Sequence, residues 1–223
     1  MRKVVLIMTM SIDGYVVAPE GMSTGGLPEP AELKRWKLDR IRRAGSHIMG
    51  RVSYEEMGPY WQRSDDAYAA PMNDIPKVVF SKTLKQATWP ESSIAKGDLN
   101  EEISKLKKQP GGEIIAWGGA GFAQALSKAG LIDEYVIVTR PIAYGGGKPL
   151  FSGLADALKL NVLMTAVYDN GTMLRIYTPT EPFSVEGSCS GASATERFQT
   201  DSNYLFLRKS GRKTAAHFSW NCP

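Results

Sequence analysis

The sequence predicts an α/β fold with a mainly parallel sheet, because short apolar runs alternate with amphipathic stretches along the chain. Residues 4–10 are almost continuously apolar, as in a strand that is buried on both faces of a parallel sheet. Similar runs occupy residues 77–81, 113–117 and 134–140, and the helical stretches occupy residues 30–44, 99–107 and 121–128. Because such sheets bind ligands at the carboxyl ends of their strands, we expect the functional residues in the loops that follow strands.

Two local signals refine this prediction. Residues 160–167 and 172–177 flank Asp169-Asn170-Gly171, a sequence typical of a tight turn between two antiparallel strands. We therefore expect a C-terminal antiparallel hairpin at one side of the sheet. Asp98, with Glu101 three residues later, is typical of a capping box and predicts that a helix begins at residue 99.

Composition excludes several classes of protein. The chain has 223 residues and a formal net charge of +4 with no basic stripe, so we expect no nucleic-acid partner. No apolar run is long enough to cross a membrane, and the apolar start is too short for a signal peptide, so we expect a soluble, unprocessed cytoplasmic protein. Two cysteines and two histidines predict neither a disulfide framework nor a metal site.

The sequence divides into a domain over residues 1–179 and a tail over residues 180–223. The tail begins with a stretch rich in Ser, Gly and Glu, and an apolar patch at residues 203–207 precedes a basic segment. We expect a flexible extension there. The alternative is an arm that binds a partner through its basic residues Arg208, Lys209, Arg212 and Lys213.

The first segment with possible chemistry is Trp117-Gly118-Gly119-Ala120-Gly121-Phe122, which follows a predicted strand and opens a helix. Adjacent glycines let the backbone approach a ligand, and the N–H groups at a helix N-terminus attract an anion. A phosphate or pyrophosphate fits such a segment. The alternative is an ordinary tight turn between a strand and a helix.

A second strand-to-helix junction lies at residues 48–55. Arg51 offers a planar fork of donors to a phosphate, and Ser53 is a candidate for capping the helix while contributing a hydroxyl. The alternative is a surface ion pair of Arg51 with Glu55 or Glu56.

Ser81 and Lys82 form a third candidate at the end of another predicted strand. Three strand ends with groups that suit phosphate together favour a nucleotide with several phosphates.

Several motifs, in this order and spacing, resemble the dihydrofolate reductase superfamily, over about residues 3–178. They are Ser11-Ile12-Asp13-Gly14-Tyr15, residues 30–37, Ile48-Met49-Gly50-Arg51, residues 130–134 and residues 141–151. The chain looks closest to the reductase domain of riboflavin biosynthesis and its stand-alone relatives. This resemblance implies a dihydrofolate reductase-like α/β fold and NADPH as the cofactor.

The resemblance also implies residue roles. The cofactor would contact Thr9, Gly50, Arg51, Ser53, Ser81, Lys82, Gly118, Gly119, Ala120, Gly121 and Phe122. In the family, the matching glycine pair is often joined by a cis peptide. Ser81 and Lys82 match the strand end that meets the 2′-phosphate, which favours NADPH over NADH, since sites that select NADH usually place a carboxylate against the ribose.

Two acids compete for the catalytic role. Glu32 matches the acid that holds the ring and assists its protonation, a role that suits a partly buried carboxyl with a raised pKa. Its alternative is an acid that only stabilises the helix N-terminus. Asp13 borders the same region, or bonds its own turn. Trp36, Met57 and Thr139 would line the substrate pocket, and core packing is the alternative for all three.

These observations predict an NADPH-dependent oxidoreductase that reduces a pterin- or pyrimidine-like C=N or carbonyl group. The activity would be like that of 5-amino-6-(5-phosphoribosylamino)uracil reductase in riboflavin biosynthesis, or like that of dihydrofolate reductase. Ala120, and the absence of a tryptophan before Pro28, depart from the folate enzymes. The alternative is a module that binds NADPH or another nucleotide without turnover. A homodimer is possible for this fold.

Overall fold

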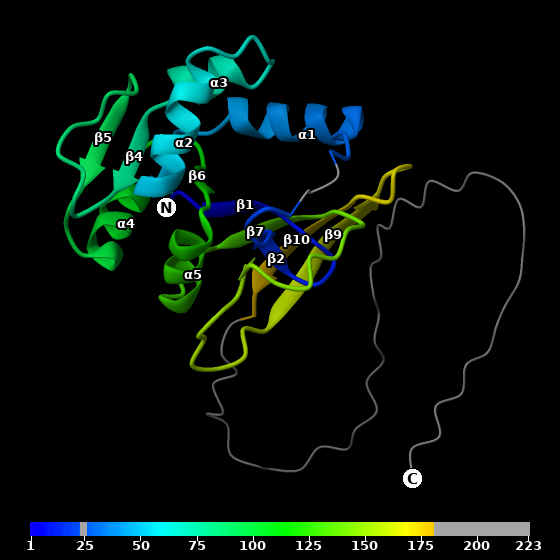
Figure 1. The fold of residues 1–223 in the computed structure, drawn as a ribbon. Helices are drawn as coiled ribbons and strands as arrows, with labels where there is room; N and C mark the ends of the chain where they lie inside the picture. The colour runs from blue at the N-terminus through cyan, green and yellow to red at the C-terminus, as the bar shows by residue number, and fades with distance from the viewer. Residues whose placement is uncertain (23–25, 181–223) are drawn as a thin grey trace, which may run out of the picture. The chain divides into compact units, whose positions relative to one another are not determined.

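The computed structural model describes residues 1–22 and 26–180 (Figure 1). An eight-stranded sheet forms the centre of this part of the chain, in the strand order β5-β4-β3-β6-β1-β7-β10-β9. Its strands are β1 (Val4–Met10), β3 (Ser46–Gly50), β4 (Lys77–Phe80), β5 (Ser92–Ala95), β6 (Ile114–Trp117), β7 (Glu134–Thr139), β9 (Leu160–Val167) and β10 (Met173–Pro179). All neighbouring strands from β5 to β7 are parallel, and β10 and β9 are antiparallel.

Helices cover both faces of the sheet (Figure 1). They are α1 (Ala31–Arg42), α2 (Arg51–Trp61), α3 (Ala69–Asp74), α4 (Leu99–Lys108) and α5 (Ala120–Lys128). Alternate residues of β1 serve the two faces: Leu6 packs with residues of α4 and α5, whereas Val5 packs with residues of α1. This explains why β1 is apolar throughout, since it has no solvent-facing side.

The predicted fold class is confirmed, and the predicted strands and helices lie within a few residues of the observed ones. The C-terminal hairpin is also confirmed, because β9 and β10 pair on either side of the predicted turn. Asp98 caps α4, as its carboxylate accepts hydrogen bonds from the backbone N–H groups of Asn100 and Glu101.

The shortest elements were not predicted from the sequence, namely β2 (Tyr15–Val17), β8 (Lys148–Pro149), α3 and β5. Strands of two to four residues are too short to show an alternation, so tertiary pairing rather than local pattern defines them. β2 pairs with β8 in a separate small sheet and thereby holds the loop after β1 against the loop after β7.

All these elements lie between residues 4 and 179. The predicted tail lies outside the described residues, apart from Thr180, so its boundary and its partner-binding alternative stay predictions. Over residues 1–22 and 26–180, no helix is long and apolar enough to cross a membrane.

Candidate functional site

The predicted cofactor residues lie along one edge of the sheet, where neighbouring parallel strands end. β4 leads to Ser81, β3 ends at Gly50, β6 leads to the glycine turn, and β1 and β7 end side by side at Met10 and Thr139. The register places Gly50 beside Phe80, and Met49 beside Trp117. Residues from five distant segments of the sequence therefore meet at the carboxyl edge of the sheet, where α/β folds bind their ligands.

Ser53 fastens α2 to the glycine turn. Its Oγ donates a hydrogen bond to the carbonyl of Gly118 at 2.8 Å and accepts one from the N–H of Gly119 at 2.7 Å. The side chain is buried, and it does not cap α2, whose N-cap residue is Gly50. These two bonds hold the backbone of the glycine turn in place. The predicted contact of Ser53 with the cofactor stays a prediction.

Two glycines are closely packed here. A Cβ on Gly118 would overlap the Sδ of Met8, and a Cβ on Gly50 would lie 3.2 Å from the Cβ of Phe122. Gly121 differs, because a Cβ there would meet no atom within 4 Å. The peptide bonds of the described residues are all trans, so the implied cis bond between Gly118 and Gly119 is not present.

The N-termini of α2 and α5 lie next to each other at this edge and are both left open. Neither helix has a side-chain cap, and neither carries an acidic residue in its first turn. The first N–H groups of a helix lack intrahelical partners, so both ends present free donors and a partial positive charge. This arrangement suits the pyrophosphate of a dinucleotide.

The other predicted cofactor residues are arranged as follows. Arg51 is exposed, and its Nη1 lies 2.7 Å from Oε2 of Glu55, which is the ion pair that the i,i+4 spacing offered as an alternative. The Oγ of Ser81 accepts hydrogen bonds from the N–H groups of Thr83 and Leu84, while Lys82 is exposed. Thr9 is exposed, Phe122 is half-buried and Ala120 is buried.

Asp13 anchors the loop that follows β7. Its carboxylate accepts hydrogen bonds from the hydroxyl of Ser11 and from the N–H groups of Tyr144 and Gly145, the last at 2.7 Å. The hydrogen bond from Ser11 is the largest cause that lowers the pKa of Asp13 to about 2, and the bonds from Gly145 and Tyr144 add to it. An acid with this pKa stays ionised near neutral pH, so these contacts favour a positioning role.

Glu32 lies in the first turn of α1 and is exposed. The partly buried setting that a proton role favours is therefore not observed. Burial first, and then the negative charges of Glu32 and Glu29, raise the pKa of Tyr168, which keeps that phenol protonated. Tyr168 thus lies near Glu32, a neighbour that the sequence analysis missed since its position depends on the hairpin turn.

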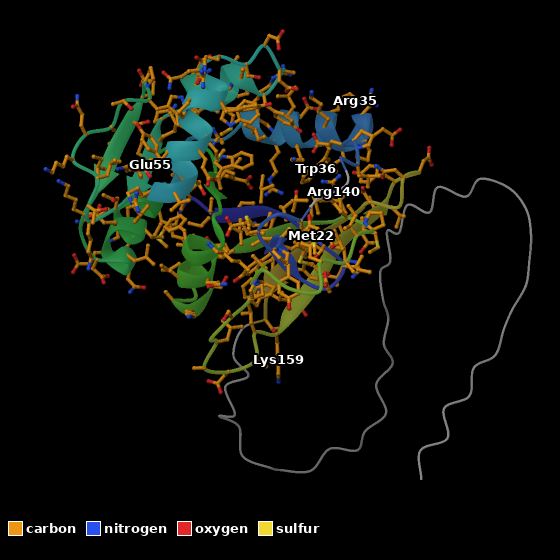
Figure 2. The ribbon with its side chains drawn as sticks, in the orientation of Figure 1. Met22, Arg35, Trp36, Glu55, Arg140 and Lys159 are labelled. Atoms are coloured by element: carbon orange, nitrogen blue, oxygen red, sulfur yellow. The ribbon has the colours of Figure 1, made fainter. Side chains whose placement is uncertain are left out.

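The proposed substrate residues belong to different parts of the core. Trp36 faces the sheet from α1 (Figure 2) and packs against the cluster that contains Leu33 and Val138. Met57 packs against a second cluster beneath α2 and α3, and Trp117 contacts both clusters. Thr139 is buried at the end of β7. Trp36 and Trp117 thus pack against the same core cluster, and Met57 packs against the neighbouring one.

Arg140 follows Thr139 directly and reaches the loop before α1 (Figure 2). Its backbone N–H donates to the carbonyl of Met10 at 2.9 Å, and its guanidinium donates to the carbonyl of Leu27. Arg140 therefore joins the ends of β1 and β7 to this loop. Arg140 was not predicted as a site residue, although it is a cation at a strand end, as Arg51 is.

Trp117 is supported by a buried histidine that the sequence analysis treated only as a possible metal ligand. The indole N–H donates to Nδ1 of His47 at 3.0 Å, and the other ring nitrogen of His47 lies 3.2 Å from the carbonyl of Pro71. Because indole can only donate, Nε2 carries the proton of a neutral imidazole. Burial is the largest cause that lowers the pKa of His47 to about 4.

Within the described residues, no group of three or more His, Cys, Asp or Glu side chains is placed to hold a metal ion.

The geometry defines an α/β domain with two uncapped helix N-termini at the carboxyl edge of its sheet, and comparisons with known proteins give its family. The model of the RibD C-terminal domain matches residues 2–174, so the chain belongs to this family. The Bacillus subtilis protein YyaP, described as uncharacterized, is 25% identical over 181 residues, which cover 79% of this chain and 94% of that protein. The family supports a reductase-like role.

Two solved structures support the same fold. A protein assigned to riboflavin biosynthesis from Shewanella sp. PV-4 has 26% identity and a TM-score of 0.68, with 80% of this chain and 99% of that chain covered. Dihydrofolate reductase from Enterococcus faecalis, solved as a complex with NADP(H), has 16% identity and a TM-score of 0.55, with 80% and 97% covered. The fold is therefore dihydrofolate reductase-like, as the resemblance implied.

Proposed function

We propose that this protein is an NADPH-dependent reductase that transfers hydride to a C=N or carbonyl group of a pterin- or pyrimidine-like heterocycle. The pair of open helix N-termini at α2 and α5, fastened to each other by Ser53, is the single observation that supports this proposal most strongly. An extra anionic charge is stabilised at such a position by free N–H groups and by both helix dipoles.

The residues present fit NADPH at this edge. The pyrophosphate would lie at the first turns of α2 and α5, where Gly121 leaves open space and Arg51 is exposed. Arg51 would exchange its pairing with Glu55 for a phosphate, a modest change since exposed ion pairs contribute little. Lys82 and the hydroxyl of Ser81 would receive the 2′-phosphate, which favours NADPH over NADH.

Bound NADPH supplies the hydride, and the protein must supply a proton to the atom next to the carbon that receives it. Asp13 is unsuited to this task, because its pKa of about 2 leaves no proton to donate near neutral pH. Glu32 is the better candidate, since it matches the acidic position of the family and is exposed to solvent, through which a proton can be relayed. Trp36 and Thr139 would border the ring on its protein side.

The decisive experiment is a titration of the full chain with NADPH and, separately, with NADH, followed by nicotinamide fluorescence and thermal stability. We expect NADPH to bind more tightly and to raise the unfolding temperature. Binding of neither cofactor would contradict the proposal. Oxidation of NADPH is then measured with a panel of pterins, pyrimidines and flavin precursors, and Glu32→Gln should lower kcat on any active compound while leaving the NADPH dissociation constant unchanged.

The alternative function is a module that binds NADPH as a sensor. The exposed position of Glu32 favours it, because the partial burial that raises the pKa of a carboxyl and keeps it protonated near neutral pH is not observed there. Tight NADPH binding without oxidation across the whole panel would support this alternative.

A further inference from the structure

Arg140 projects from the face of the sheet that α1 covers. Val138, two residues earlier in β7, belongs to the core cluster that contains Leu33 of α1. The backbone N–H of Arg140 donates to the carbonyl of Met10, so the extended pairing of β7 with β1 continues to Arg140. Because side chains alternate between the two faces of a strand, Arg140 points to the same face as Val138. In Figure 2 its side chain lies below α1.

The same face carries other residues of the candidate site. Thr9 pairs with Val138 in the register of β1 and β7, so its exposed side chain points to this face as well. Trp36 packs against the core cluster on this face, and Glu32 lies one helical turn before Trp36. Arg140 therefore lies where the strand ends meet the first turns of α1, which is the region proposed for the heterocycle.

The charge of Arg140 is not neutralised by an acid within the described residues. Its guanidinium donates to the carbonyl of Leu27, a neutral acceptor, and it forms no ion pair over residues 1–22 and 26–180. Arg40, a half-buried arginine of α1, differs because it forms ion pairs with Glu113 and Glu134. Since an arginine side chain stays charged in proteins and carries several N–H donors, Arg140 can still bind a negatively charged group.

The proposed reaction creates negative charge in this region. When hydride adds to the carbon of a C=N or C=O bond, the π electron pair moves to the nitrogen or oxygen, which stays negative until a proton arrives. Asp13 has no proton to donate near neutral pH, and Glu32 is exposed. Fixed N–H donors that point at such an atom lower the barrier, because they stabilise the charge as it develops.

We propose that Arg140 is a further catalytic residue, whose guanidinium donates hydrogen bonds to the ring atom that becomes negative during hydride transfer. The inference rests on the proposed function. The ring carbon gains a C–H bond as NADPH is oxidised to NADP⁺, the π electron pair moves to nitrogen or oxygen, and that atom then takes a proton from water relayed by Glu32. The bond to Leu27 holds the guanidinium at the strand ends, and its other N–H groups remain for the substrate.

The first test uses an ionised pterin ring as a substitute for the negative charge and needs no turnover. 6-Hydroxymethylpterin loses a ring proton in mildly alkaline solution, and its two forms differ in absorbance. At one pH, with the full chain saturated with NADP⁺, the ratio of ionised to neutral bound pterin should be about tenfold higher in the natural sequence than in Arg140→Gln, since a nearby cation favours the anion.

Arg35→Gln is the matched control for this titration. Arg35 is exposed on α1 and points away from the sheet (Figure 2), so this variant removes the same charge from the same helix region without touching the site. It should keep the ratio of the natural sequence. Arg140→Met, which has no donor and a side chain of similar length, replaces Arg140→Gln if the latter does not fold.

The second test separates catalysis from binding. On any heterocycle that the chain reduces, Arg140→Gln should lower kcat about a hundredfold, as the loss of a donor to a developing charge does elsewhere, and should change KM only a few fold. Arg140→Lys keeps the positive charge and should recover part of kcat. If Arg140 only held the loop through Leu27, Arg140→Gln would leave the ratio of ionised to neutral pterin unchanged.

An unchanged ratio in Arg140→Gln, or a higher KM with unchanged kcat, would overturn the role of Arg140. These outcomes are distinct from a failure of the proposed function, which would appear as a chain that binds neither NADPH nor NADH. A chain that binds NADPH but no pterin would also overturn the inference, because the ring that Arg140 is proposed to contact would have no place at the site.

Discussion

The N-termini of α4 and α5 differ in how their first backbone N–H groups, which have no partner within the helix, are satisfied. α4 begins after Asp98, whose carboxylate accepts hydrogen bonds at 2.8 and 3.2 Å from the first-turn N–H groups, and Glu101 and Glu102 follow. α5 begins after Gly119 with no side-chain cap and no acid in its first turn. Each missing device costs a helix up to about 1 kcal/mol.

This difference in capping indicates which helix N-terminus can still attract a negatively charged ligand. α4 satisfies its own donors and gains stability from residues next to it in sequence. At α5, Ser53 binds Gly118 and Gly119, and no side chain caps the helix that follows. The first N–H groups of α4 have partners within the chain, whereas those of α5 would gain a partner when an anion binds.

The largest effect on NADPH binding is expected when the first turn of α5 receives an acidic residue, as the first turn of α4 has. Gly121→Asp places a carboxylate in the first turn of α5, in space where a Cβ meets no atom within 4 Å. We expect the unfolding temperature to hold or rise, because Asp suits a helix N-terminus better than Gly inside a helix. The NADPH dissociation constant should rise about a hundredfold through repulsion of the pyrophosphate.

Gly121→Asn is the matched control for size without charge. It should weaken NADPH binding several times less than Gly121→Asp in a fluorescence titration. Equal affinity of the natural sequence and Gly121→Asp would contradict the placement of the pyrophosphate at α5.

The next effect is a loss of folding stability at acidic pH, caused by His47, which binds Trp117 before the glycine turn. Unfolded His47 binds a proton below its ordinary pKa of 6.5, whereas folded His47, neutral and bonded to Trp117, does so only below about 4. Between these values the unfolded state holds more protons, so stability falls as the pH falls. We expect a loss of about 2 kcal/mol from pH 7 to pH 5 in denaturant titrations.

His47→Gln is the comparison variant for this window, because glutamine is polar and does not titrate. It should be less stable at pH 7 and should show a flatter dependence of stability on pH between 7 and 5. If the free energy of unfolding depended on pH equally in both proteins, groups other than His47 would cause the loss of stability in acid.

The sequence predicted features that depend on neighbouring residues better than features that depend on contacts between distant segments. Strand positions followed from apolar runs, and the ion pair of Arg51 with Glu55 was an open alternative because helix spacing alone brings the two together. Bonds between distant segments left no such pattern. Ser53 bonds to Gly118, 65 residues away, and Asp13 bonds to Tyr144, 131 residues away.

The same reasoning explains the candidate site. The strand ends could be predicted to meet, since parallel strands share an edge, but the setting of each side chain could not. Glu32 matched an acidic position by sequence, yet its exposure depends on how α1 packs in the folded chain. His47 had no motif around it, and its role follows only from burial against Trp117.

A smaller effect is expected for Arg51, which lies at the open end of α2. Arg51→Ala should raise the NADPH dissociation constant about tenfold, the value of one charged hydrogen bond, with little change in unfolding temperature. Glu55→Gln releases Arg51 from its 2.7 Å ion pair and should strengthen NADPH binding by a few fold. Opposite changes in these two variants, measured by the same titration, would locate Arg51 at a cofactor phosphate.

The smallest effect is expected at the capped end, and it completes the comparison. Asp98→Ala removes the acceptor of two N–H groups and should lower the free energy of unfolding by about 1 kcal/mol. Its effect on the NADPH dissociation constant should be small, because β5, which precedes α4, lies three strands away in the sheet from β6, which leads to the glycine turn. Asp98→Asn should recover much of the stability, since asparagine also caps helices. A change in NADPH binding equal to that of Arg51→Ala would mean that both helix ends serve the cofactor, and the contrast between α4 and α5 would lose its functional meaning.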